Sequence, residues 1–254
     1  MTRLPCPHRL LIFISIIFLL HAWPSLAVAA DNPEFRPALI GNGPKSLVNL
    51  IDVQKLLQQG QGDALVMFSA FAAGGRPFKG YSTIDNATPD SKLLQKEVLR
   101  ELDKAEIVPA IAHHESVLVT FRGTVVFSAN SKPHLRIFAN QERDEIANGN
   151  DFVAPQLLLD TVDWDLSNDE LRVALHHQIK CVAELSLRVD ASGKTVNVTV
   201  AREEPPKLNF GDAARKAFAK ARFIPGFRNG KPVECSFHLT EFYHPYHYLV
   251  ERWR

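Results

Sequence analysis

The side chains best suited to chemistry in this sequence are its neighbouring histidines. They occur at His113-His114, at His176-His177 and at His244-Pro245-Tyr246-His247. Adjacent histidines in a strand point to opposite faces, and neither a cysteine nor an i+4 histidine follows the first pair, as a zinc site would require. We therefore expect a turn at the first pair, a helix end at the second and a surface tail at the third, with no metal and no other cofactor.

One cluster of aspartates could serve acid–base catalysis. Asp163, Asp165 and Asp169 surround Trp164 in DTVDWDLSNDEL. Asp165 and Ser167 or Asn168 are better suited to cap a helix that starts at this point. The chain has no Gly-x-Ser-x-Gly elbow, no phosphate-binding loop and no zincin pattern. We predict that the protein is not an enzyme and that it has no catalytic residues.

Composition narrows the class of partner. The 254 residues carry a formal net charge of +1, with 46% hydrophobic and 22% charged residues, which is an ordinary globular composition. Proteins that bind nucleic acid have an excess of lysine and arginine, which contact the phosphates. This sequence has no such excess of basic residues, which argues against nucleic acid as the main partner. The length fits one or two domains.

The first thirty residues have the pattern of a secretory signal peptide. Two arginines precede the apolar run LLIFISIIFLL, and small residues follow in AVAA, which places cleavage at Ala29 or Ala30. The alternative is an uncleaved membrane anchor, because residues 10–30 are nearly long enough to span a bilayer. We predict export to the periplasm, with the inner membrane as the alternative location.

The C-terminal half predicts a β-β-α-β unit. Residues 181–201 alternate in polarity on both sides of the turn Ala191-Ser192-Gly193-Lys194, which predicts a hairpin. In FGDAARKAFAKARF the apolar residues recur at helical spacing, and Pro225 with Gly226 ends the helix. The turn RNGKP then leads into an alternating run, VECSFHLTEFY, which predicts a third strand.

The same order recurs in the N-terminal half. The run DALVMFSAFAAGGRPFKGYSTI is followed by a predicted helix with Thr88 as N-cap, Pro89 at the first helical position, and Leu94, Val98 and Leu102 on one face. SVLVTFRGTVVFS comes next, with an extra strand near residues 135–137. Gly75 and Gly193 are 118 residues apart, as are Leu39 and Leu157, and Pro109 and Pro225 are 116 apart. A near-constant offset indicates an internal duplication. We predict a signal peptide (1–30), a degenerate domain (31–140), a linker (141–151) and a second domain (152–254), in an α+β fold with antiparallel sheets packed on helices.

The second half resembles the C-terminal domain of TonB-family energy transducers. The resemblance lies in ELSLRVDASGKTVNVTV, AARKAFAKARF and IPGFRNGKPV and covers residues 181–243; the first half follows the pattern only loosely. The matching positions are Val189, Asp190, Gly193, Phe223, Pro225 and the turn Asn229, Gly230, Lys231, Pro232 and Val233. The resemblance implies a domain that grips an extended segment of an envelope protein, such as an outer-membrane receptor. Its alternative implication is a membrane-anchored energy transducer for outer-membrane transport.

The strand order predicts where such a segment would bind. A right-handed crossover from the second strand to the third places the first strand in the middle, which leaves the third strand at an edge. Edge strands present unpaired N–H and C=O groups that another chain can complete. The predicted partner-binding residues are Val233, Glu234, Cys235, Ser236, Phe237, His238 and Leu239. The alternative is that the edges of the two repeats pair with each other and bind nothing.

Cys181 and Cys235 are the cysteines left after removal of residues 1–30. In the predicted sheet the two strands are antiparallel neighbours, and each cysteine lies near the start of its strand. The start of one antiparallel strand lies opposite the end of the other, so the two cysteines are separated by several residues of ~3.3 Å each. This distance exceeds the reach of a disulfide. We predict two unpaired, largely buried thiols.

Overall fold

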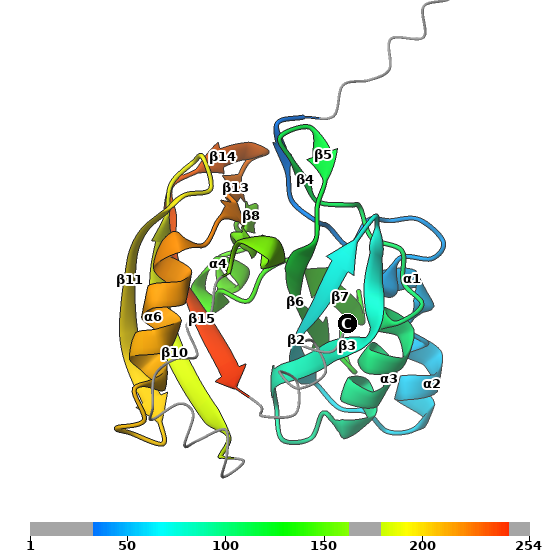
Figure 1. Cartoon of the computed structure of the whole chain (residues 1–254). Helices are drawn as coiled ribbons and strands as arrows, with labels where there is room; N and C mark the ends of the chain where they lie inside the picture. Colours follow the sequence, from blue (N-terminus) through cyan, green and yellow to red (C-terminus); the bar gives the residue numbers. More distant parts are fainter. Residues whose placement is uncertain (1–32, 163–178, 244–254) are drawn as a thin grey trace, which may run out of the picture. The chain divides into compact units, whose positions relative to one another are not determined.

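Two antiparallel sheets, each covered on one face by a helix, give the chain its α+β architecture (Figure 1). The structure is a computed structural model, and it describes residues 33–162 and 179–243. The predicted fold class is confirmed in this respect.

The C-terminal sheet contains β10 (Cys181–Val189), β11 (Thr195–Glu204) and β15 (Cys235–Tyr243), in the order β11-β10-β15. The predicted central position of the first strand is therefore confirmed. Along β10 alternate side chains are buried, so that Ala183, Leu185 and Leu187 face the core. This alternation is what the period-two pattern of a half-buried strand requires.

Helix α6 (Phe210–Lys220) packs on β10 and β11 and supplies the other side of this core. Its small residues Ala213, Ala214 and Ala217 are buried with Phe218, at the helical spacing expected from the sequence. Charged residues, among them Lys216 and Lys220, lie on the exposed face. The helix therefore forms because its apolar face is buried against the sheet.

The N-terminal sheet contains β2 (Ala64–Ala73), β3 (Arg76–Ala87), β6 (Val119–Phe127) and β7 (Leu135–Phe138), in the order β3-β2-β6-β7. The predicted extra strand is β7, which pairs with β6. Helix α3 (Lys92–Leu102) packs against β2 and β3 and buries the predicted face Leu94, Val98 and Leu102.

Helix α3 begins later than the sequence suggested. We expected Thr88 as the N-cap and Pro89 in the first turn, but Ser91 is the N-cap. The Thr88 hydroxyl instead accepts a hydrogen bond from the backbone amide of Leu65 at 3.2 Å, and the Thr88 amide donates to the Leu65 carbonyl. These bonds tie Thr88 to the sheet, so the helix starts after one further turn.

Short elements complete the described chain. Those of the N-terminal half are β1 (Phe35–Arg36), α1 (Leu47–Leu50), α2 (Val53–Gln58), β4 (Ile111–Ala112) and β5 (Glu115–Ser116). Those that follow are α4 (Arg143–Ala147), β8 (Phe152–Val153), β9 (Gln156–Leu157), the 3-10 helix η1 (Leu159–Thr161), β12 (Phe223–Ile224), β13 (Gly226–Arg228) and β14 (Lys231–Val233).

The third strands of the two sheets have the same length and the same register against the central strand. Both β6 and β15 are nine residues long. The pairing of β2 with β6 runs from Ala64↔Phe127 to Ala72↔Val119, and that of β10 with β15 runs from Cys181↔Tyr243 to Val189↔Cys235. In both sheets the first residue of the central strand therefore lies opposite the last residue of the third.

Residues 141–151, which the sequence suggested as a linker, contain α4 and contact both halves. The side-chain amide of Gln141 donates to the Phe68 carbonyl at 3.0 Å and to Asp85 at 2.9 Å. Glu145 on α4 forms an ion pair with Arg228. The described residues, 33–162 and 179–243, belong to one compact unit. The division of this unit into domains at residues 140 and 152 stays a prediction.

Several sequence predictions fall outside the described residues. These are the signal peptide with Ala29 and Ala30, the aspartates Asp163, Asp165 and Asp169, the histidines His176 and His177, and the tail that contains His244 and His247. Among the helices within residues 33–162 and 179–243, none has the length and apolar character needed to cross a membrane.

Candidate interaction edge

The turn of the C-terminal hairpin is held by one aspartate. Asp190 Oδ1 accepts hydrogen bonds from the backbone amides of Ser192 at 2.9 Å and Lys194 at 3.0 Å, and from the Ser192 hydroxyl at 2.7 Å. The Ser192 hydroxyl bond is the main reason that the pKa of Asp190 lies below its usual value. This motif aspartate therefore shapes the β10–β11 turn.

Gly193 lies where the hairpin turn touches the segment after α6. Its φ is +78°, and a Cβ at this position would lie 2.0 Å from the Phe223 carbonyl oxygen. The Phe223 amide donates to the Gly193 carbonyl at 2.9 Å. In the N-terminal half the Ile107 amide donates to the Gly75 carbonyl at 2.8 Å, and Gly75 also has a positive φ of +83°. A side chain would block the close backbone approach at Gly193, whereas at Gly75 a Cβ would lie 3.0 Å from the Ile107 carbonyl oxygen.

The predicted turn at Asn229 and Gly230 joins β13 to β14, with φ values of 51° and 72°. Two positive φ values in a two-residue loop define a type I′ turn, for which Asn-Gly is the preferred pair. Lys231 and Pro232 follow in β14 and are exposed. His113 and His114 occupy the corresponding loop between β4 and β5 with φ values of 51° and 69°, so the predicted turn at this histidine pair is confirmed.

The predicted partner-binding residues lie on two strands. Val233 is in β14 and pairs with Gly226, and Glu234 lies between the strands, so the edge strand begins at Cys235 and not at Val233. On β15 the side chains alternate: Phe237 and Leu239 are buried, whereas Ser236, His238 and Thr240 are exposed. Among the described strands β15 pairs with β10 alone, and the N-terminal sheet is separate. The expected edge is therefore present at Cys235–Tyr243.

One donor of this edge already has a partner within the chain. The backbone amide of His238 donates to Glu142 Oε1 at 3.0 Å, and His238 Nδ1 lies 3.5 Å from Glu142 Oε2. The His238 side chain is 78% exposed, and 23% of the Glu142 side-chain surface is exposed. Glu142 comes from the segment that precedes α4, and no sequence signal connects it with His238.

A charged pair lies further along the same strand. Glu241 Oε1 is 3.6 Å from a guanidinium nitrogen of Arg122 on β6. Although 23% of the Glu241 side-chain surface is exposed, burial raises its pKa to about 7; Arg122 opposes this effect and Asp85 adds to it. Arg122 Nε is buried and has no hydrogen-bond partner within the described part of the chain.

A polar cavity of about 360 Å³ lies beside His238 and Thr240. Its lining is Met67, Asp85, Asn86, Arg122, Gln141, Glu142, Arg143, Asp144, His238 and Thr240. The cavity therefore adjoins the outer edge of β15 and contains side chains of both charges.

The two thiols are unpaired, as predicted. Cys181 lies opposite Tyr243 and Cys235 lies opposite Val189, at the two ends of the β10–β15 pairing. Cys181 is buried and Cys235 is half-buried. Burial raises the pKa of Cys181 and raises that of Cys235 to about 11. The register confirms the argument that these residues are too far apart for a disulfide.

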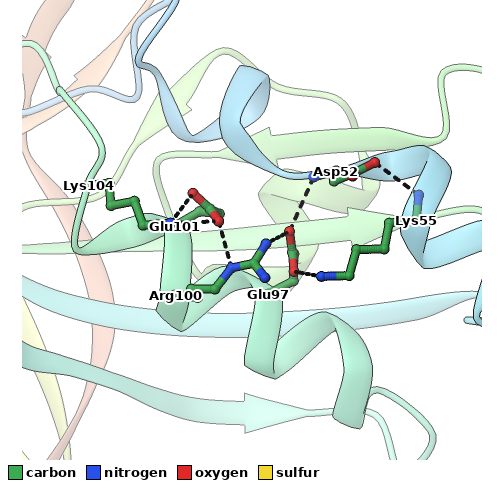
Figure 2. A network of polar contacts seen from close by, with 6 residues as sticks. All are labelled: Asp52, Lys55, Glu97, Arg100, Glu101 and Lys104. Carbon is green, nitrogen blue, oxygen red and sulfur yellow. Dashed lines mark hydrogen bonds and ion pairs between the residues drawn. The ribbon is translucent and has the colours of Figure 1, made fainter.

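A second group of charged residues lies on α2 and α3 (Figure 2). Arg100 forms one ion pair with Glu97 and a second, at 2.7 Å, with Glu101. Glu101 also forms an ion pair with Lys104 at 3.1 Å. Burial raises the pKa of Glu101, but the hydrogen bonds from Lys104 and Arg100 outweigh it and lower the pKa overall. Both buried carboxylates are thus matched by cations, which indicates a structural role for this network.

The described residues contain no group of three or more His, Cys, Asp or Glu side chains placed to hold a metal ion. Residues 172–244 match the family model of the Gram-negative bacterial TonB protein C-terminal domain. This match spans β10, β11, α6 and β15, and it bears out the resemblance found in the sequence. No curated protein and no solved structure matches the chain. The matched segment is a TonB C-terminal-like domain, a kind of domain that mediates protein interactions in the cell envelope.

Proposed function

We propose that this chain is an exported, non-enzymatic protein of the cell envelope that binds partner proteins through its TonB C-terminal-like domain. The partner contributes an extended segment, which adds to the sheet as a fourth strand along β15. An outer-membrane receptor is the kind of partner that the family match favours.

The observation that carries this proposal is the place of β15 at the edge of the matched domain. It is nine residues long and pairs with β10 alone among the described strands. Its exposed side chains are polar up to Thr240, and no proline interrupts it. Backbone groups along such an edge can bond to a further strand, while the alternate side chains select its sequence.

Site-specific crosslinking in cells of the natural source tests the proposal. A photoreactive amino acid is placed at Ser236 or Thr240 on β15, and at Asn197 on β11 as the matched exposed control. We expect crosslinks to a discrete envelope protein from β15, within a segment that mass spectrometry identifies, and none from Asn197. Equal crosslinking from both strands, or none from β15, would contradict strand addition at this edge.

The location of the protein belongs to the same proposal. We infer cleavage at Ala29 or Ala30 and release into the periplasm, on the basis of the signal-peptide pattern in the sequence. N-terminal sequencing of the protein purified from cells decides between this and the anchored transducer. A mature chain that begins at Ala30 or Asp31 supports the proposal, and a chain that retains the apolar run supports the transducer.

We also infer that the N-terminal half arose by duplication of the same unit. The support is the shared strand order, the equal register of β6 and β15, and the matching hydrogen bonds of Ile107 to Gly75 and of Phe223 to Gly193. An experimental structure tests this: the segments β2-β3-α3-β6 and β10-β11-α6-β15 should superpose strand for strand. Different register or crossover hand in the two halves would exclude duplication.

A further inference from the structure

The centre of β15 is closed along its edge by a segment of the same chain. The backbone amide of His238, the fourth of the nine residues in β15, donates to Glu142 Oε1 at 3.0 Å. A partner strand paired at this point would place a carbonyl oxygen where this carboxylate oxygen lies, because neighbouring strands join through N–H···O=C bonds of about the same length. Glu142 therefore takes the place of one contact that an added strand would make.

Glu142 belongs to a short strap, residues 141–147, which is anchored on both sides of it. Before Glu142, the side-chain amide of Gln141 donates to the β2 backbone at 3.0 Å. After it, Glu145 on α4 accepts a hydrogen bond from Arg228 at 3.1 Å. Arg228 lies on β13 and not on β15. The attachment of the strap can therefore be altered without any change to the edge itself.

The strap is held by polar bonds and contributes little to the hydrophobic cores. None of residues 141–150 is buried, and Ile146 on α4 packs against neither core. The polar cavity of about 360 Å³ is lined both by the strap and by Thr240 on β15, so the two are incompletely packed. Segments with few buried apolar contacts open at a low cost in free energy. The strap can thus detach while both sheets stay folded.

We propose that the strap is an autoinhibitory device, which closes the edge of β15 in the free chain and must detach before a partner segment can bind. This inference rests on the strand addition proposed above. The apparent affinity for the partner is then the intrinsic affinity reduced by the fraction of chains in which the strap is open. Binding at β15 therefore depends on the ion pair between Glu145 and Arg228, although neither residue lies on that strand.

The first test needs no partner and measures amide hydrogen exchange of His238 by NMR. Glu142→Ala removes the bond to this amide, whereas Glu145→Ala removes the anchor on Arg228 and leaves Glu142 in place. Asp144→Ala is the control, because it removes an exposed carboxylate from the same helix. We expect exchange to be faster by roughly tenfold in Glu142→Ala and roughly threefold in Glu145→Ala, with no change in the control. Unchanged exchange in Glu145→Ala would show that the strap does not detach as a unit and would overturn the proposal.

The second test measures binding by isothermal titration calorimetry. The probe is a set of synthetic twelve-residue peptides, enriched from a random library displayed on phage by selection against the Glu142→Ala chain. We expect binding tighter than to the unaltered chain by roughly fivefold for Glu142→Ala and roughly twofold for Glu145→Ala, and no difference for Asp144→Ala. The gain in Glu145→Ala cannot come from the loss of a charge at the edge, because Glu142 is still present. Urea unfolding confirms that all three variants are folded.

NMR chemical shifts locate the bound peptide and separate the two proposals. Shifts at the amides of residues 236–240, together with the expected order of affinities, support the strap as an inhibitor. The same shifts with equal affinities for all four chains would overturn autoinhibition and leave strand addition at β15 in place. Peptides that shift no amide of β15 in any of the chains would contradict the proposed function and, with it, this inference.

Discussion

The side chain of Gln156 forms two hydrogen bonds with the backbone of Ala38, which lies 118 residues earlier in the chain. Gln156 Oε1 accepts from the Ala38 amide at 2.7 Å, and Gln156 Nε2 donates to the Ala38 carbonyl at 2.8 Å. Both residues are buried. The separation is the same as that between Gly75 and Gly193, so the glutamine connects two positions that the proposed duplication makes equivalent.

Replacement of Gln156 by alanine should therefore destabilise the fold. The change leaves the buried amide and carbonyl of Ala38 without partners, at a cost of roughly 1–3 kcal/mol for each group. We expect the free energy of unfolding, measured by urea denaturation, to fall by about 2–6 kcal/mol. The exposed Gln54 on α2 provides the control, since Gln54→Ala should change this free energy by less than about 0.5 kcal/mol. A Gln156→Ala variant as stable as the control would show that the two bonds contribute nothing.

The glycines of the C-terminal unit should differ in their tolerance of a side chain. Gly193→Ala forces a positive φ and also brings a methyl group within 2.0 Å of the Phe223 carbonyl, so the hairpin and the segment after α6 must separate. Gly230 has a similar φ of +72° but open space around it. We expect a loss of about 1 kcal/mol for Gly230→Ala and more than about 3 kcal/mol for Gly193→Ala in urea denaturation. Equal losses would mean that backbone strain alone decides the cost.

Both thiols should react slowly in the folded chain. The pKa of Cys235 is raised to about 11 by burial, and Cys181 is fully buried, so little thiolate is available at pH 8. We expect alkylation by iodoacetamide at pH 8 to be at least tenfold slower than in 6 M guanidinium chloride, with both cysteines modified after unfolding. Mass spectrometry under non-reducing conditions should find no Cys181–Cys235 link. Such a link would require a different register of β15 against β10.

Glu241 should make stability depend on pH. Its pKa is raised to about 7 in the folded chain, from an ordinary value of 4.5, so the folded state holds the proton more tightly than the unfolded state. The free energy of unfolding therefore declines as pH rises from 4.5 to 7. Glu241→Gln cannot ionise and should remove about 2 kcal/mol of this decline, an amount that allows for partial exposure of the side chain.

The measurement for Glu241 is urea unfolding of both proteins at pH 5 and pH 8. Glu234→Gln is the control, because Glu234 is exposed on the same stretch of chain and pairs with Arg188 at 3.6 Å. The control should decline with pH as the unaltered chain does. If Glu241→Gln loses as much stability between pH 5 and pH 8 as the unaltered chain, then the ion pair with Arg122 fully offsets the effect of burial on the pKa of Glu241.

Local patterns were sufficient to predict β10, β11 and α6 of the C-terminal unit, whereas the third strand begins at Cys235 and not at Val233. The alternation in residues 181–201 and the helical spacing of the alanines after Phe210 each reflect burial of one face, and the structure has β10, β11 and α6 there. The helix start at Thr88 was wrong because the Thr88 hydroxyl bonds to the β2 backbone, which is 23 residues away in the chain. A local pattern contains no information about such a contact.

The edge of β15 could be located from the sequence, but its surroundings could not. Strand order follows from connection rules, which leave the third strand outermost. Glu142 precedes α4 and lies 96 residues before its partner His238. Arg122 is on β6 and lies 119 residues before its partner Glu241. Only the tertiary packing of distant segments brings these charges beside β15, so spacing in the sequence gives no sign of them.

The bond between Glu142 and the His238 amide also bears on self-association. An edge strand has unpaired backbone groups with which a second copy of the chain can pair, and this pairing leads to aggregation. Natural proteins oppose it with charged side chains at the edge. Two copies that met edge to edge at β15 would bring two Glu142 carboxylates together in a confined space, and each copy would have to give up its own capping bond. The Glu142 carboxylate would in this way oppose edge-to-edge association of copies of the chain at β15.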